Sequence, residues 1–375
     1  MEAKKHFGPL GIIALPGCEK LAKQVNGYLV AWRADRSTDQ AGYVADSYLL
    51  DVKLNRYFGG EAKAILPQTV RGYDLYIMVD VCNYSIEYEM SGHMNPMSPD
   101  DHYMNLKRVI SACTGKPSRI NVIMPFLYES RQHRRTSRES LDCAMMLQEL
   151  EGMGVDNILT FDAHDPRICN AIPLTGFENL PTSYQFVKTM INLDIHEQFD
   201  KDSVLIISPD EGAVERAIYF ANILGVNVSI FYKRRDYTQV VNGRNPIVAH
   251  EYLGEDLAGK TAIVVDDMIA SGDSIIDVGK QLKARGAKKV IACASFGLFT
   301  SGMERFDRAV EEGIIDKVLT TNLIYQNPET LRRDYYVSVD MSEYLASIVD
   351  TLNHNTSLER YISSNEKITS KLKNS

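Results

Sequence analysis

The stretch TAIVVDDMIASGDSIID, residues 261–277, holds the residues of this chain whose types and spacing are best suited to chemistry. Asp266 and Asp267 end an apolar run, and adjacent carboxylates accept hydrogen bonds well, so neighbouring sugar hydroxyls are natural partners. A helix is expected to begin just beyond them, and backbone N–H groups at a helix start bind anions. The residues between are Ala270, Ser271, Gly272, Asp273 and Ser274. The stretch therefore predicts a sugar-phosphate site, although a polar turn before a capped helix would have a similar sequence.

A carboxylate inside that loop is unexpected. Asp273 stands beside the predicted phosphate position, where a second negative charge is repelled. As a helix cap, its side chain would also compete for the N–H groups that the phosphate needs. We therefore expect the Asp273 side chain to point away from the phosphate and to leave only its backbone N–H to the ligand.

Eight apolar runs along the chain are candidate buried strands, and helical segments separate them. Continuous Val- and Ile-rich runs, without strict alternation, indicate strands covered on both faces, as in a parallel sheet. Their alternation with helices predicts an α/β fold, doubly wound, in which ligands bind outside the carboxyl ends of the strands. The runs are 75–81, 120–126, 157–163, 203–210, 226–232, 261–267, 289–299 and 317–324.

Composition and charge exclude several classes of function. At 375 residues the chain is long enough for about two domains. Its net charge of −8 argues against a nucleic-acid-binding protein, and six scattered cysteines without a C-x-x-C pair disfavour a zinc site or a disulfide framework. No run approaches the ~18 apolar residues of a membrane span, and no signal peptide is recognised. We expect a cytoplasmic protein with reduced thiols and no membrane contact.

The segment IVVDDMIASGDS resembles the ribose 5-phosphate-binding signature of type I phosphoribosyltransferases. Over roughly Leu15 to Leu358 the chain more narrowly resembles the ribose-phosphate pyrophosphokinase (PRPP synthetase) family. The resemblance implies two tandem phosphoribosyltransferase-like (Rossmann-like) domains, each a mostly parallel sheet flanked by helices. We place them at 1–182, on the ATP side, and at 183–358, on the ribose 5-phosphate side, before a polar C-terminal extension at 359–375.

Two segments resemble the family's ATP-binding parts. RYFGGE lies at the spacing of the family's RFSDGE adenine-binding hairpin, which makes Tyr57 the stacking residue and matches Glu61 to the family's Glu. Gly59 replaces an Asp in that hairpin. RQHRR resembles the family's RQDRK, so the resemblance implies that Arg131 and Gln132 contact ATP.

Further segments imply metal-binding and catalytic residues. FDAHDPRI resembles the family's DLH-x-x-Q-I, and ISPDEGAVERA resembles its SPDAGG-x-KRA, which makes His164 and Asp210 ligands of the implied cofactor, Mg²⁺. FYKRRDY matches the Lys-x-Arg that opens the family's mobile catalytic loop, so Lys233 and Arg235 would stabilise charge on the transferring group. Since one histidine and one aspartate make no tight standing site, we expect them to hold the ion mainly when ATP brings its own oxygens.

The resemblance implies a ribose-phosphate diphosphokinase, which transfers the diphosphoryl group of ATP to the anomeric hydroxyl of ribose 5-phosphate, giving PRPP and AMP for nucleotide biosynthesis. The family usually forms homohexamers, so a hexamer or another dimer-based homo-oligomer is expected. Two alternatives stay open. One is a catalytically silent regulatory subunit, favoured by Gly59, His133, Asp273 and an insertion at 83–101, which we interpret as a long loop. The other is a phosphoribosyltransferase that consumes PRPP.

Overall fold

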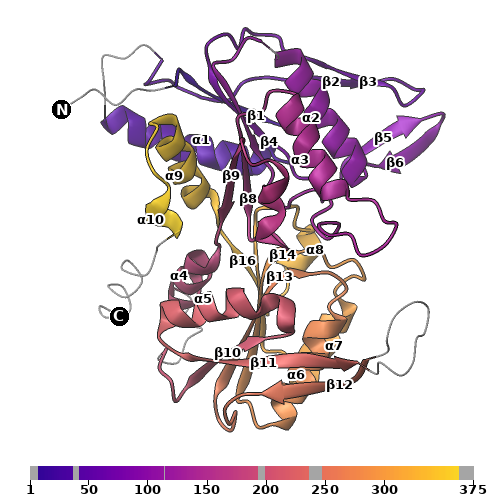
Figure 1. Cartoon of the computed structure of the whole chain (residues 1–375), viewed down its shortest axis with the longest axis vertical. Coiled ribbons are helices and arrows are strands. Elements are labelled where there is room, and N and C mark those ends of the chain that lie inside the picture. Colours follow the sequence, from indigo (N-terminus) through magenta and orange to yellow (C-terminus); the bar gives the residue numbers. More distant parts are fainter. Residues whose placement is uncertain (1–6, 37–41, 114, 193–198, 236–246, 363–375) are drawn as a thin grey trace. The chain divides into compact units, whose positions relative to one another are not determined.

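The computed structural model describes residues 7–36, 42–113, 115–192, 199–235 and 247–362, with the backbone alone for 233–235, 247–250 and 362. The chain divides into two compact units, which are described separately (Figure 1). Unit 1 comprises the residues up to Pro181 together with 322–325 and 340–362, and unit 2 comprises 182–321 and 326–339. The predicted domains, 1–182 and 183–358, differ from these units in Thr182, which lies in unit 2, and in 322–325 and 340–358, which lie in unit 1.

Unit 1 is built on a five-stranded parallel sheet with the order β1-β4-β7-β8-β9. Alternate residues of a strand face opposite sides, and Leu75 and Ile77 pack in one core with helices α2 and α3. Figure 1 shows helices α1 and α9 on the other side of the sheet. The elements are β1 (Leu10–Ala14), α1 (Glu19–Asp35), β4 (Asp74–Met78), α2 (Pro99–Cys113), β7 (Arg119–Ile123), α3 (Asp142–Gly152), β8 (Asn157–Phe161), the 3-10 helix η1 (Pro166–Ala171), β9 (Gly176–Leu180), α9 (Ser342–Asn353) and α10 (Glu359–Ile362).

Two antiparallel hairpins also belong to unit 1. They are β2 (Lys53–Arg56) with β3 (Ala62–Ile65), and β5 (Glu87–Met90) with β6 (His93–Pro96). The predicted long loop at 83–101 is therefore wrong, because most of that segment forms β5, β6 and the start of α2. Ser91 and Gly92 have positive φ values of 52° and 82°, as the tight turn of a two-residue hairpin requires. This Ser-Gly pair was the overlooked signal.

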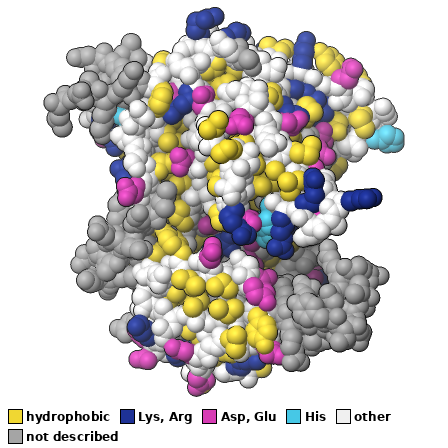
Figure 2. Space-filling view, in the orientation of Figure 1, with side chains coloured by type: hydrophobic (Ala, Val, Ile, Leu, Met, Phe, Trp, Pro, Cys, Tyr) yellow, Lys and Arg dark blue, Asp and Glu magenta, His cyan; other side chains and the backbone are white. Residues whose placement is uncertain are grey.

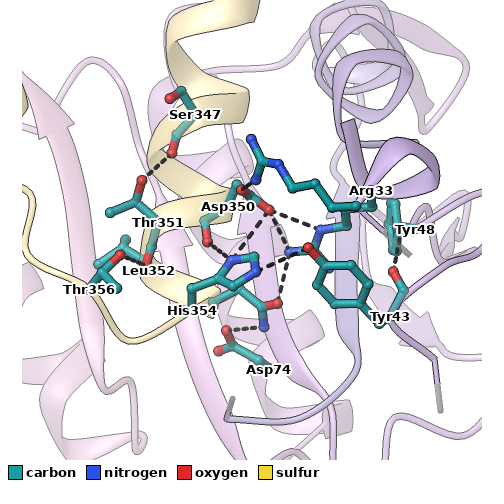
Figure 3. Close-up of polar contacts among 12 residues, drawn as sticks. Arg33, Tyr43, Tyr48, Asp74, Ser347, Asp350, Thr351, Leu352, His354 and Thr356 are labelled. Carbon is teal, nitrogen blue, oxygen red and sulfur yellow. Dashed lines mark hydrogen bonds and ion pairs between the residues drawn. The ribbon is translucent and has the colours of Figure 1, made fainter. Parts of the chain in front are cut away.

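Helix α9 lies in unit 1 because its Asp350 pairs with Arg33 of α1 (Figure 3). Arg33 is 1% exposed, and it donates from Nε to Asp350 Oδ1 at 3.0 Å and from Nη2 to Asn353 Oδ1 at 2.8 Å. The rings of Tyr43 and Tyr48 each lie 5.0 Å from its guanidinium carbon. Since a buried charge is tolerated only when it is paired and hydrogen-bonded, this network fixes α9 against α1.

Unit 2 contains a seven-stranded sheet with the order β12-β11-β10-β13-β14-β15-β16, in which β11 and β12 are antiparallel and the other described pairs are parallel. Helix α5 packs on β10, β11 and β13, whereas α6 and α7 share a core with strand residues such as Leu205 and Val264. The elements are α4 (Ser183–Asn192), β10 (Val204–Ser208), the 3-10 helix η2 (Glu211–Ala213), α5 (Val214–Leu224), β11 (Asn227–Arg235), β12 (Ile247–Leu253), β13 (Thr261–Ile269), α6 (Asp273–Ala284), β14 (Lys289–Gly297), α7 (Glu304–Glu311), β15 (Lys317–Thr321), α8 (Pro328–Leu331) and β16 (Tyr336–Val339).

The predicted α/β fold is confirmed, since each of the eight apolar runs overlaps a strand of one of the two sheets. The sequence did not predict β1, β9 and β16, which have five or fewer residues, or β12, which has seven. All six cysteines are free thiols. Within the described ranges, we find no helix with the length and apolar character that a membrane crossing needs.

Candidate active site

Strand β13 of unit 2 carries the predicted pair of acids near its carboxyl end. The Asp267 side chain is buried, and its backbone N–H donates to Asp266 Oδ1 at 2.8 Å. Burial, together with the adjacent Asp267 charge, raises the pKa of Asp266 well above its usual range. Nη1 of Arg216, a residue of α5, lies 3.9 Å from Asp266 Oδ1. A hydroxyl group that donates to these two acids would therefore favour their ionised form.

The loop 270–272 joins β13 to α6, and its geometry suits an anion. Gly272 has a φ of 89°, and a Cβ at this position would lie 2.4 Å from the Phe306 ring, so the loop requires glycine. The first helical hydrogen bond runs from Ile276 N to Gly272 O at 3.0 Å. The amides of residues 273–275 therefore have no intrahelical acceptor, and the exposed Ser274 lies among them.

The Asp273 carboxylate is held by two side chains, one of them from α7. Its Oδ1 accepts a hydrogen bond from Arg305, and its Oδ2 accepts one from the Ser271 hydroxyl at 2.9 Å. The Ser271 hydroxyl, followed by the Arg305 guanidinium, holds the pKa of Asp273 below its usual range. That the Asp273 side chain points away from a bound phosphate is not tested by these contacts and stays a prediction.

Two more predicted segments of unit 2 lie at neighbouring strands. Asp210 follows β10 and caps η2, accepting a hydrogen bond from Gly212 N at 3.0 Å. Lys233 and Arg235 lie in β11, where the pairing with β12 shifts register between Arg234 and Arg235. The side chains of Lys233 and Arg235 lie outside the described residues, so their predicted catalytic contacts stay predictions.

Unit 1 brings together two of the predicted ATP-side segments. Arg131 and Gln132 are exposed after β7, and His164 is exposed after β8. His133 links the two loops, with its Nε2 3.4 Å from Asp165 Oδ2 and its ring centroid 5.3 Å from that of His164. Partial burial lowers the pKa of His133. On the face drawn in Figure 2, Lys and Arg side chains gather beside a histidine.

The predicted adenine hairpin is β2–β3, with Tyr57, Gly59 and Glu61 in its turn region. Tyr57 N donates to Glu61 O at 2.8 Å, and the Tyr57 side chain is half-exposed, as a stacking platform must be. The second hairpin lies against it, since Ser91 N donates to Phe58 O at 2.8 Å. The contacts of β2–β3 include those to β5–β6 and to α2.

Comparison with known proteins identifies the family. The model for the N-terminal domain of ribose phosphate pyrophosphokinase matches residues 10–154, and that for the phosphoribosyl transferase domain matches residues 177–323. A ribose-phosphate pyrophosphokinase of Prochlorococcus marinus (strain MIT 9313) is 30% identical over 272 residues, which are 72% of this chain and 73% of that protein. This chain belongs to the ribose-phosphate pyrophosphokinase family.

Other members of the family match more of the chain. The ribose-phosphate pyrophosphokinase of Vibrio vulnificus (strain YJ016) is 27% identical over 312 residues, which are 82% of this chain and 90% of that protein. The crystal structure of phosphoribosylpyrophosphate synthetase from Mycobacterium smegmatis superposes with a TM-score of 0.72 at 22% identity, covering 92% of this chain and 99% of that one. At this identity the superposition supports the fold.

The metal-binding capacity of this pyrophosphokinase-family chain follows from its donor set. Within the described ranges, no three His, Cys, Asp or Glu side chains are grouped so as to hold a metal. Asp165, the neighbour of His164, accepts hydrogen bonds from Arg167 Nε and Nη2 at 2.9 and 2.8 Å, and these hold the pKa of Asp165 at about 2. The donors suit an ion such as Mg²⁺ that arrives with phosphate and water oxygens of its own.

The sequence did not predict two arginines that lie near acids of the candidate site, Arg216 near Asp266 and Arg305 at Asp273. Arg216 stands in the segment ISPDEGAVERA, where the family has a basic pair, and that match was the available signal. Arg305 lies on a different helix, 32 residues after Asp273, so no motif spacing could find it. The only sequence signal for Arg305 was Asp273 itself, an acid in a phosphate loop that needs a cation.

Proposed function

We propose that this chain is an active ribose-phosphate diphosphokinase, forming PRPP and AMP from ribose 5-phosphate and ATP. The carrying observation is the pair Asp266 and Asp267 on β13, followed within five residues by the glycine-led start of α6. Family membership supplies the reaction, and this arrangement supplies what a sugar phosphate needs: acceptors for its hydroxyls at the strand end and, at the helix start, amides that have no acceptor within the helix.

Ribose 5-phosphate would bind to unit 2. Its ring hydroxyls would donate to Asp266 and Asp267, and its phosphate would accept hydrogen bonds from the amides of 273–275 and the hydroxyls of Ser271 and Ser274. The anomeric oxygen then forms a bond to the β-phosphorus of ATP. The bridging bond from α-phosphorus to β-phosphorus breaks on the β side, AMP leaves with the bridging oxygen, and the hydroxyl proton passes to solvent.

ATP would bind to unit 1 through Arg131 and Gln132, with its base against a hairpin that carries Tyr57 and Glu61. Whether that hairpin belongs to the same copy or to another copy of a homo-oligomer depends on assembly, and we propose a homo-oligomer in the cytoplasm. His164 and Asp210 are the proposed protein ligands of Mg²⁺, which would neutralise the charge of the ATP phosphates.

Lys233 and Arg235 are the proposed catalytic residues. Phosphoryl transfer depends on alignment and on charge neutralisation more than on covalent chemistry from the protein. Arg suits a forked contact with phosphate oxygens, and Lys acts as a point charge. We expect Lys233→Ala to lower kcat by orders of magnitude while ATP binding survives. Lys280→Ala, which removes an exposed lysine of α6, is the matched control.

The direct test is product analysis of the purified chain with Mg²⁺. ATP with ribose 5-phosphate should yield AMP, whereas PRPP with a nucleobase should yield no nucleotide. AMP at background level would contradict the proposal and favour a silent subunit, and nucleotide formation from PRPP would favour a phosphoribosyltransferase. Near-normal turnover of Lys233→Ala would overturn the catalytic assignment alone.

A further inference from the structure

The start of α6 carries an ion pair whose cation comes from another helix. Asp273 is the first residue of α6, and Arg305, on α7, donates to its Oδ1. Its other oxygen accepts the Ser271 hydroxyl at 2.9 Å. Both carboxylate oxygens are therefore engaged, one by a cation and one by a hydroxyl that also belongs to the proposed phosphate loop.

The placement of Arg305 is fixed by its neighbour in the sequence. Phe306 is fully buried, and its ring fills the space where Gly272 lacks a Cβ, 2.4 Å from the position that atom would take. The segment before α7 is also tied to the loop, because Thr300 N donates to Ala270 O at 2.9 Å. These two contacts fix the position of α7 relative to the loop, and that position brings Arg305 within reach of Asp273.

The same pair directs the carboxylate toward the outer surface of the two helices. Asp273 and Arg305 both line a surface pocket of about 260 Å³, whose other walls come from residues of α6, α7 and the segment after α7. Ile276, Asp277 and Lys280 are its lining residues on α6, so Asp273 lies on the stripe of α6 that faces this pocket. The amides of residues 273–275 have no acceptor within α6 and point along the helix axis, away from that stripe, although the Asp273 amide lies 3.4 Å from Ser271 Oγ.

We infer that Arg305 is a positioning residue of the ribose 5-phosphate site. It neutralises Asp273 and holds the carboxylate in the pocket between α6 and α7, so that a phosphate can occupy the helix start beside an acid. The inference rests on the proposed function, which assigns residues 270–274 to the sugar phosphate. When the phosphate takes the Ser271 hydroxyl, the Arg305 contact remains as the restraint on Asp273.

Steady-state kinetics of Arg305 variants test this inference. Without the cation, Asp273 repels the phosphate, so Arg305→Met should raise KM for ribose 5-phosphate about tenfold or more at low salt, with KM for ATP and kcat nearly unchanged. The increase should shrink as ionic strength rises, because exposed charges are screened. Arg305→Lys should restore most of the affinity, since the charge is kept. Arg332→Met, which breaks the exposed pair of Arg332 with Glu329, is the matched control and should leave KM unchanged.

A double variant shows whether Arg305 acts through Asp273. In the Asp273→Gly background, Arg305→Met should have little further effect on KM for ribose 5-phosphate. The inference is overturned by an unchanged KM in Arg305→Met, by a KM increase that persists at high salt, or by equal effects of Arg305→Met with and without Asp273.

Failure of the proposed function would be visible separately, as absence of AMP from the wild-type chain. In that case calorimetry with ribose 5-phosphate alone tests the inference. Weaker binding by Arg305→Met than by Arg332→Met supports it, and equal binding or no binding by the wild type contradicts it.

Discussion

Two arginine–aspartate pairs of this chain use the same chemistry in opposite surroundings. Arg33 and Asp350 have side chains 1% and 10% exposed, and they join α1 to α9 in unit 1 (Figure 3). Arg305 and Asp273 have side chains 45% and 57% exposed, and they join α7 to the start of α6 in unit 2. The first pair is enclosed by two tyrosine rings and an asparagine, whereas the second shares its acid with a loop hydroxyl.

The difference shows how burial decides what an ion pair does. Removing one partner of a buried pair leaves a desolvated charge, so the pair is tied to stability. Breaking an exposed pair lowers the free energy of unfolding only slightly, because water replaces the lost partner. The Arg33–Asp350 pair therefore holds a helix in place, whereas we assign the Arg305–Asp273 pair to the charge at the proposed ribose 5-phosphate site. The three predictions below test this division, in order of decreasing effect.

Breaking the buried pair should have the largest effect. Asp350→Ala leaves Arg33 unpaired at 1% exposure and should lower the free energy of unfolding by about 3–5 kcal/mol, measured by urea denaturation. The double variant Arg33→Met/Asp350→Leu should lose much less, since no buried charge remains. A loss below about 1 kcal/mol in Asp350→Ala, typical of an exposed pair, would contradict the division.

The stability of the fold should depend on pH through the buried carboxyl group of Asp80. Asp80 is 3% exposed and accepts hydrogen bonds from Cys82 N at 2.9 Å and Tyr325 N at 2.6 Å, and burial raises its pKa to about 6. Because the pKa is higher in the folded state, ionisation of Asp80 opposes folding. Its contribution to stability is complete below about pH 4 and is lost as pH rises through about 6.

The matching measurement compares the wild type with Asp80→Asn in urea between pH 4 and pH 7. The free energy of unfolding of the wild type relative to the variant should fall by roughly 2 kcal/mol over this range. A difference that grows with pH would show that the two backbone hydrogen bonds to the ionised acid outweigh its desolvation.

Breaking the exposed pair should have the smallest effect on stability. Arg305→Met should unfold at the same urea midpoint as the wild type, as should Arg332→Met, because both arginines are largely solvated. A clear decrease in the midpoint of Arg305→Met alone would show that the exposed pair also stabilises the fold. That result would contradict the contrast with Arg33 and Asp350.

The same contrast explains what the sequence could predict. The eight apolar runs identify strands because burial on both faces leaves a local signal of Val and Ile. Asp266, Asp267 and Gly272 were likewise predictable, since they occupy one strand, loop and helix start. The position of α9 depends on a pair separated by 317 residues, and Arg305 lies on another helix from Asp273. Such partners leave no local pattern, and only the folded chain brings them together.

The proposed diphosphokinase reaction is tested most directly by following ATP labelled at the γ-phosphate, with ribose 5-phosphate and Mg²⁺. Since the β- and γ-phosphates are transferred as one group, the label should appear in PRPP, with one AMP formed for each PRPP. Label recovered as inorganic phosphate, transfer accompanied by ADP, or no transfer at all would contradict the account.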